Sequence, residues 1–290
     1  MDAYLLQILT GIASGAILFI VASGLTLIFG VLRIANFAHG ALYMLGAYLM
    51  VSIGNDVGYS NVTFWISLLL SGLAVAGIGV LIEFVALRPI YGRSNLTQLV
   101  VTFALALIIA GSLRGYYGSA PLGGTPPPAL STAVSVFGGF FPEYQLFLIG
   151  LAGAVAVALW LILYASSFGS TIRAAVTDPE LLSLTGRNVR LLYTVVFAIG
   201  AFLAGLAGAA ISSQGAVAPG MDIDVIIRAF VVVVIGGLGN LWGALVASLL
   251  VGIAEALGIL WVPSASLVVV FGLLVIVLAV RPQGLLARTT

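Results

Sequence analysis

The chain contains 290 residues, of which 62% are hydrophobic and only 7% are charged, and its formal net charge is +1. Apolar stretches long enough to cross a hydrocarbon core of about 30 Å recur along the whole sequence, which excludes an ordinary soluble domain. The sequence contains no cysteine, so disulfide bonds, thiolate metal sites and thiol catalysis are excluded. The small net charge indicates no particular partner, and no nucleic acid is expected to bind.

The apolar stretches predict an all-α fold, a polytopic bundle of about eight to ten transmembrane helices without a soluble domain. We expect residues 1–290 to form this single transmembrane domain. In chain order, the predicted spans are 7–30, 37–54, 62–86, 96–114, 142–165, 191–213, 223–240, 242–261 and 264–280.

The predicted span 223–240 is unusually short. Only about a dozen apolar residues lie between its charged start and its glycine-rich end, so a half-helix or broken helix is as well supported as a full crossing. Non-helical backbone survives at membrane depth only where protein buries it or where it lines a cavity. We therefore expect the glycine cluster that begins at Gly236 to lie inside the bundle.

The distribution of arginine predicts the orientation of the chain. The connections 55–61 and 115–141 contain no basic residue. The alternate connections and the C-terminal end carry Arg33, Arg88, Arg93, Arg173, Arg187, Arg190, Arg281 and Arg288. Because short arginine-bearing loops stay in the cytoplasm, we expect the N-terminus outside and the C-terminus inside a bacterial inner membrane. Arg114 and Arg228 fall near the outer side and need separate explanations.

The polar segment 166–190 carries the signals of a short helix. Asp178 is a good N-cap, Pro179 suits the first helical position, and Glu180 places negative charge at the positive end of the helix dipole. Gly186 fits the C-terminal end, so the sequence predicts a helix of about two turns. A capped helix on a basic loop indicates a docking point for a cytoplasmic partner.

Two separated segments share an interruption. Residues 24–48 and 235–245 each place small residues and an asparagine shortly before a Gly-Ala-Leu helix start. Paired interrupted segments in the two halves of a transporter point to its translocation site. The residues expected to line such a path are Asn36, His39, Gly40, Gly236, Gly237, Asn240 and Glu255.

Asn36 and His39 each have two interpretations. The amide of Asn36 either caps the following helix or lines the path. His39, the single histidine of the sequence, is either a gating group or a helix-start residue bonded to backbone, and we favour the second. A lone imidazole without partner ligands does not predict a metal site.

Several charged residues fall inside or beside predicted spans. An ionised Glu255 costs at least about 2.5–3.5 kcal/mol at the membrane centre, so it should face the bundle interior with a partner or stay protonated. Glu83 near the inner interface predicts a structural pair or a snorkelling group. Asp224 and Arg228 have the i, i+4 spacing of a helical ion pair. Alternatively, Asp222 and Asp224 contact basic residues of a docking protein.

Five segments together carry a family resemblance over nearly the full length. They are the block 24–48, Arg88-Pro-Ile-Tyr91, the pattern from Gly169 through Arg173 and Asp178-Pro-Glu to Gly186-x-Asn188-Val, Phe202-x-x-Ala-Gly-x-Ala-Gly208, and the block from Pro219-Gly to Gly-Gly-Leu-Gly-Asn240. With these residues, the chain resembles the permease subunits of branched-chain amino acid ABC importers, specifically the smaller of the two related permeases.

The resemblance implies partners and a mechanism. In such importers the loop between the middle spans carries a coupling helix, which the match assigns here to the segment around Asp178–Gly186. Arg173 then ties that helix to the membrane body or to the ATPase. The implied partners are a second, homologous permease, two ATP-binding subunits and a periplasmic substrate-binding protein. The implied mechanism is alternating access without covalent chemistry in this chain.

The sequence excludes ATP hydrolysis by this chain alone. A Walker A loop needs a lysine that reaches the phosphates, and the sequence contains no lysine. We therefore expect no catalytic residue, cofactor or metal. The remaining alternatives are an importer for urea, short amides or another small polar solute, an ion-coupled secondary transporter, and an intramembrane hydrolase, for which His39 lacks a nucleophile at a recognisable spacing.

Overall fold

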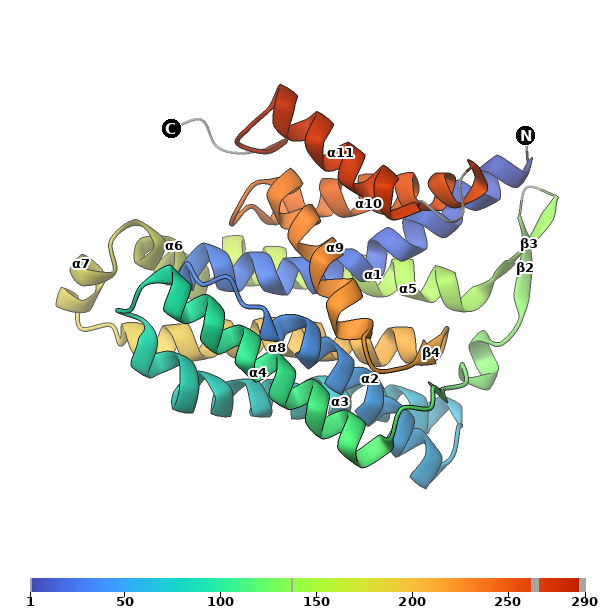
Figure 1. The fold of residues 1–290 in the computed structure, drawn as a ribbon, viewed down its shortest axis with the longest axis horizontal. Helices are drawn as coiled ribbons and strands as arrows, with labels where there is room; N and C mark the ends of the chain where they lie inside the picture. The colour runs from blue at the N-terminus through green and yellow to red at the C-terminus, as the bar shows by residue number, and fades with distance from the viewer. Residues whose placement is uncertain (1, 137, 262–265, 287–290) are drawn as a thin grey trace.

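The computed structural model describes residues 2–136, 138–261 and 266–286. Their fold is an all-α bundle in which most helices run along one long axis (Figure 1). The α-helices are α1 (Asp2–Leu32), α2 (Ala38–Val57), α3 (Asn61–Ile82), α4 (Asn95–Tyr117), α5 (Glu143–Trp160), α6 (Ser167–Thr177), α7 (Pro179–Leu184), α8 (Val189–Ser212), α9 (Met221–Gly236), α10 (Leu241–Trp261) and α11 (Ser266–Val280).

Shorter elements extend or connect these helices. A π-helical turn, Glu83–Leu87, and a 3-10 turn, Arg88–Ile90, continue α3, and a second π-helical turn, Leu161–Ala165, continues α5. Another 3-10 turn spans Pro128–Leu130. The strands are β1 (Leu122–Gly123), β2 (Ala133–Val136), β3 (Gly139–Pro142) and β4 (Ala216–Val217). β1 pairs with β4 and β2 with β3, both antiparallel.

The nine predicted spans correspond, in order and position, to the helices α1–α5 and α8–α11. Six of the described helices are long and apolar enough to cross a membrane. The doubtful span 223–240 is α9, whose 16 residues reach only about 24 Å at 1.5 Å per residue. It is therefore a short helix, and Figure 1 shows it crossing the bundle obliquely. Residues 264–265 of the last predicted span lie outside the described residues.

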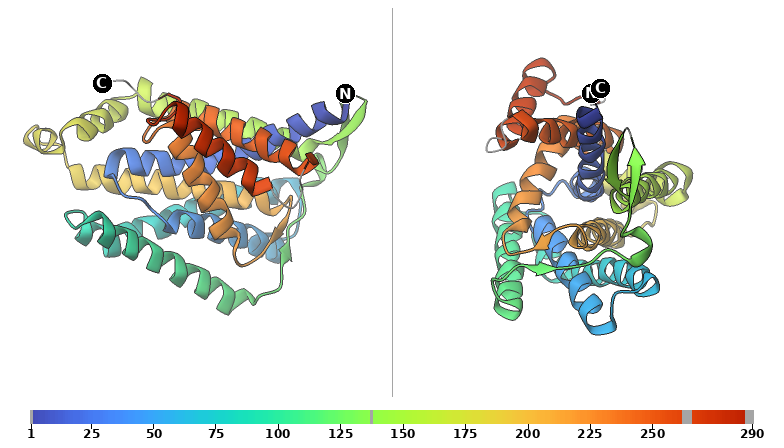
Figure 2. Two further views of the ribbon diagram at one scale, coloured as in Figure 1. Left: turned by 45° about the horizontal axis from the view of Figure 1, so that its top comes forward. Right: turned by 90° about the vertical axis from the view of Figure 1, so that its right-hand side faces the viewer.

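The bundle is organised around α1 and α8. Of the most apolar window of α1, 83% is buried, whereas in α4 the corresponding share is 17%. Viewed along the helices, α1 and α8 lie inside the bundle and α3, α4 and α11 at its periphery (Figure 2). The exposed side chains of the peripheral helices are mostly apolar, as expected of surfaces that face lipid.

Glycines allow the central helices to approach until their backbones touch. A Cβ atom built on Gly208 of α8 would lie 1.8 Å from the carbonyl oxygen of Tyr43 in α2. One built on Gly46 of α2 would lie 2.2 Å from the carbonyl oxygen of Gly205 in α8. Close backbone contact of this kind maximises van der Waals attraction between membrane helices. The α2–α8 interface therefore requires glycine at these positions.

We expect Gly208→Val to destabilise the bundle by about 1–3 kcal/mol, because the new side chain overlaps backbone that cannot move aside. The matched control is Gly153→Val in α5, where an added Cβ meets nothing within 4 Å. Thermal unfolding of both variants in detergent measures the difference. Equal unfolding temperatures would show that the α2–α8 contact does not limit stability.

Candidate functional site

The short helix at the tip of the bundle has the termini that the sequence predicts. The Asp178 carboxylate accepts hydrogen bonds from the backbone N–H groups of Glu180 at 3.0 Å and Leu181 at 2.9 Å. Pro179 occupies the first turn. Gly186 has a φ of +80°, in the left-handed region that glycine adopts without strain. The interpretation of Asp178 as an N-cap is thus confirmed.

The helix α7 presents apolar side chains outward. It lies at the end of the molecule opposite the N-terminus and stands clear of the other helices (Figure 1). Leu181 is 61% exposed and Leu184 is 83% exposed. Leu182 is buried against the end of the bundle, which fixes the orientation of the helix. Sequence reasoning found the caps of α7 but missed these leucines.

A second helix, α6, connects α7 to the bundle and was not predicted. The Ser166 hydroxyl caps it by accepting a hydrogen bond from Gly169 N at 3.1 Å. The Arg173 guanidinium donates to the carbonyl oxygen of Leu163 and lies 5.9 Å from the centre of the Tyr164 ring. Of the two roles considered for Arg173, these contacts support attachment to the membrane body.

Arg33 makes the corresponding attachment from α1. Its Nη2 donates to the carbonyl oxygen of Val176 in α6 at 3.3 Å. Arg33 also has a φ of +57°, which is unusual for a non-glycine residue. Arg33 and Arg173 therefore tie α6 to the ends of α1 and α5.

Asn36 and His39 lie where the chain re-enters the bundle. The connection after α1 runs back toward the middle of the molecule before α2 begins (Figure 1). Asn36 is fully buried, and its amide has no hydrogen-bond partner among the described residues. No side chain caps α2, so the interpretation of Asn36 as a helix cap is wrong. His39 is also fully buried, and its Nε2 lies 3.0 Å from the Val21 carbonyl oxygen, which agrees with the backbone-bonded interpretation.

The two interrupted segments paired in the sequence meet in space. A Cβ built on Gly30 would lie 3.1 Å from Gly239 Cα. Gly40 faces the first turn of α9, the helix that leads into the second interrupted segment. A Cβ on Gly40 would lie 2.3 Å from the carbonyl oxygen of Asp222. The starts of α2 and α9 therefore touch directly.

The corner between α9 and α10 contains three of the predicted path residues, Gly236, Gly237 and Asn240. A Cβ on Gly236 would lie 2.6 Å from the carbonyl oxygen of Gly243, and Gly237 has a φ of +97°. The Asn240 side chain accepts from Gly243 N at 3.0 Å and donates to the Leu286 carbonyl oxygen. Asn240 thus caps α10 and anchors the described C-terminal end.

Glu255 has a partner that the spacing of the sequence did not indicate. Arg228 Nη2 of α9 lies 3.2 Å from Glu255 Oε1 of α10. This ion pair explains an arginine that the orientation rule left unexplained. The predicted i, i+4 pair of Asp224 with Arg228 is not what forms, because Arg228 bridges to α10 instead. Glu255 was expected either to have a partner inside the bundle or to stay protonated, and the structure gives it a charged partner.

Glu83 is buried in the π-helical turn after α3 and does not snorkel to the surface. Its carboxyl group accepts hydrogen bonds from the Tyr91 hydroxyl at 2.5 Å and the Thr194 hydroxyl at 2.8 Å. Burial, followed by the hydrogen bond to Glu83, raises the pKa of Tyr91 well above its usual value. The phenol therefore stays protonated and remains a donor, and Glu83 joins α3 to α8.

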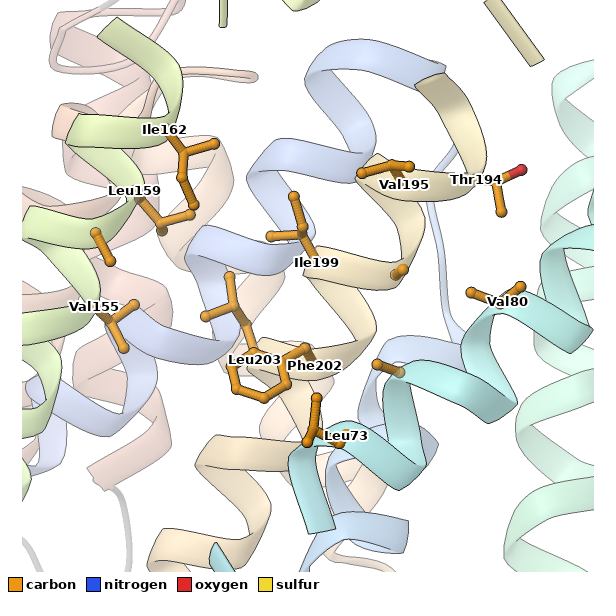
Figure 3. A pocket seen from close by; sticks show the side chains of 13 residues that line it. Leu73, Val80, Val155, Leu159, Ile162, Thr194, Val195, Ile199, Phe202 and Leu203 are labelled. Atoms are coloured by element: carbon orange, nitrogen blue, oxygen red, sulfur yellow. The ribbon is translucent and has the colours of Figure 1, made fainter. Parts of the chain in front are cut away.

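An apolar cavity of about 400 Å³ lies between α3, α5 and α8. Figure 3 shows side chains from the three helices converging on it, including Leu73, Leu159 and Phe202. Apart from Thr194, the labelled lining is hydrocarbon. Such a surface suits lipid tails and provides no contact for a polar solute.

A second cavity, of about 270 Å³, lies beside the ion pair. It is lined by Ser14, Ile17, Leu18, Tyr43, Ile211, Gln214, Met221, Asp224, Val225, Arg228, Gly252 and Glu255. The lining combines charged, polar and apolar groups, which is typical of a ligand site. Within residues 2–136, 138–261 and 266–286, no group of three or more His, Asp or Glu side chains has the arrangement of a metal site.

The long apolar helices are those of a multi-pass membrane protein. The family described as branched-chain amino acid transport system, permease component, matches residues 7–278. The chain therefore belongs to this family of ABC importer permeases, as the sequence motifs indicated.

Individual relatives agree with this assignment. The chain is 30% identical to the high-affinity branched-chain amino acid transport system permease protein BraD of Pseudomonas aeruginosa, over 98% of this chain and 96% of the relative. It is 28% identical to LivH of Escherichia coli K12 with the same coverage. It is 25% identical to LivM of that strain, over 93% of this chain and 68% of the relative. It thus resembles the smaller, LivH-type permease over the full length.

We expect Thr194→Val to destabilise the protein by about 1–3 kcal/mol, because it removes a hydrogen bond to a buried carboxyl group and keeps the shape of the side chain. Thr194→Ser retains the hydroxyl and should be close to the parent. Thermal unfolding in detergent compares the two variants. If both unfold at the same temperature, the Glu83 link does not stabilise the α3–α8 contact.

Proposed function

We propose that this chain is the membrane-spanning subunit of an importer that moves branched-chain or related amino acids into the cell. The relatives named for branched-chain amino acid transport support this solute class, because they match almost the whole chain. The similarity to both LivH and LivM supports pairing with a second, homologous permease. A periplasmic binding protein delivers the solute, and two separate subunits hydrolyse ATP.

The single observation that supports the coupling role best is the exposed, capped helix α7. Its leucines cannot remain in contact with water without cost, and Leu184 alone is 83% exposed. A cleft in an ATP-binding subunit would cover them. If an ATP-binding subunit covers α7, then α7 is cytoplasmic and the N-terminus is on the outer side, as the arginine distribution predicts. The coupling residues are Arg173, Asp178, Pro179, Glu180 and Gly186.

The contacts of α6 and α7 suggest how a push is transmitted. Arg173 and Arg33 tie α6 to the ends of α5 and α1. A short turn leads from α7 into α8. Thr194 of α8 donates a hydrogen bond to Glu83, in the turn that continues α3. Close contact at Gly208 then links α8 to α2. A displacement of α7 would therefore reach the interrupted segments near Asn36, His39 and the α9–α10 corner, and alternate the access to the path.

Asp178→Ala should weaken α7 by about 0.5–2 kcal/mol, because two backbone N–H groups lose their acceptor. We expect amino acid uptake by the reconstituted complex to fall more than its basal ATP hydrolysis. Asp178→Asn keeps an acceptor at the same position and should retain most uptake. Unchanged coupling in the alanine variant would remove α7 from the transmission route.

Uphill leucine uptake should require the ATP-binding subunits. Proteoliposomes that contain both permeases, both ATP-binding subunits and loaded binding protein should accumulate leucine when ATP is supplied. Vesicles that contain this chain alone should not. Accumulation by the chain alone would identify a secondary transporter, and uptake of urea or a short amide in place of leucine would change the solute class.

A further inference from the structure

The ion pair between Arg228 of α9 and Glu255 of α10 lies at a depth where a membrane protein must either shelter a charge or use it. Glu255 is six residues from the end of α10 at Trp261, which corresponds to about 9 Å along a helix. It therefore lies within the apolar part of the bundle. The Arg228 side chain is 36% exposed and the Glu255 side chain 13% exposed in this single chain. Because charged groups avoid lipid, this exposed edge must face a water-filled path or the second permease.

The pair leaves hydrogen-bonding groups unused. Arginine has five N–H donors in a planar fork that matches a carboxylate. Arg228 contacts Glu255 through one Nη atom, and its buried Nε has no partner in the described part of the chain. An ion pair that served only to join two helices would be expected to satisfy a buried donor of this kind. Because the Arg228 side chain is 36% exposed and contacts Glu255 through Nη2, the exposed N–H groups of the fork can bind a second carboxylate.

The adjoining cavity has complementary groups on its other sides. Asp224 lies one helical turn before Arg228 and also lines it. The cavity thus has carboxylates that complement a cation and a guanidinium that complements an anion. Ile17, Leu18 and Val225 supply an apolar wall. At about 270 Å³, the cavity is just below the size of drug-binding pockets and suits a small molecule.

From this geometry we propose that Arg228 and Glu255 form a contact site for the zwitterionic head of the transported amino acid. The Arg228 fork receives the α-carboxylate through its free N–H groups. Glu255, with Asp224, receives the α-ammonium, and the apolar wall receives the side chain. The proposal rests on the function proposed above and specifies the residues that select an amino acid over an uncharged amide.

The test uses the complete importer, with both permeases, the ATP-binding subunits and binding protein saturated with radiolabelled leucine. Saturation removes the affinity of the binding protein from the measured rate. Uptake is expressed per assembled complex, so a variant that folds poorly is not scored as inactive. Arg228→Met and Glu255→Gln should each lower the uptake rate at least tenfold. Arg114→Met is the control, because that arginine, in the last turn of α4, is also on the outer side and its side chain donates to Ser119 just after the helix.

The charge exchange Arg228→Glu with Glu255→Arg separates recognition from helix pairing. It preserves an ion pair between α9 and α10 but reverses the positions of the two charges. We expect the exchanged importer to assemble and hydrolyse ATP, with uptake still reduced at least tenfold. Restored uptake would show that the pair is only structural and would overturn the proposal. Parent-like uptake by Arg228→Met would overturn it as well.

The result for the parent protein distinguishes this inference from the proposed function. If the parent importer takes up leucine and the variants do so equally, the zwitterion site is wrong and the function stands. If the parent importer takes up no amino acid, the proposed function itself fails, and the site fails with it.

Discussion

The contact that the rest of this structure depends on is backbone against backbone at glycine. Lipid tails are as apolar as leucine, so burying hydrocarbon between two membrane helices provides little of the drive that it provides in water. Helices must instead approach closely, as α2 and α8 do at Gly46 and Gly208. The same contact joins α9 to α10 at Gly236. These interfaces leave no room for adjustment by side chains, so the central helices are held in close and fixed contact.

Within that rigid frame, polar groups occupy the positions that the frame shelters. Glu83 accepts hydrogen bonds from two hydroxyl groups between α3 and α8. Glu255 forms an ion pair with Arg228 between α9 and α10. The first group is completely buried and satisfied, which suits a fixed joint. The second is partly exposed, which suits contact with a moving solute. The two carboxylates share a chemistry but differ in what remains available for binding.

The sequence predicted the features that are determined locally. Hydropathy placed the spans because each needs a long apolar run, and the residues around Asp178 placed α7 because cap, proline and glycine act on their own backbone. The partner of Glu255 was not predictable, since Arg228 lies on another helix and the nearer Asp224 offered a plausible i, i+4 pair. The burial of Glu83 and of the Asn36 amide also depends on which helices meet. The helix α6 was missed because its serine, glycine and threonine content is atypical of helices.

The ion pair between α9 and α10 also has a consequence for biogenesis. The helix α9 is short and contains Asp222, Asp224 and Arg228, so on its own it would partition poorly into the bilayer from the translocon. The long, apolar α10 carries the opposite charge that neutralises Arg228 and follows after a tight glycine corner. The two helices are therefore best inserted together, so that the charges meet before either helix contacts lipid. Because α9 is synthesised first, we expect it to enter the bilayer only together with α10.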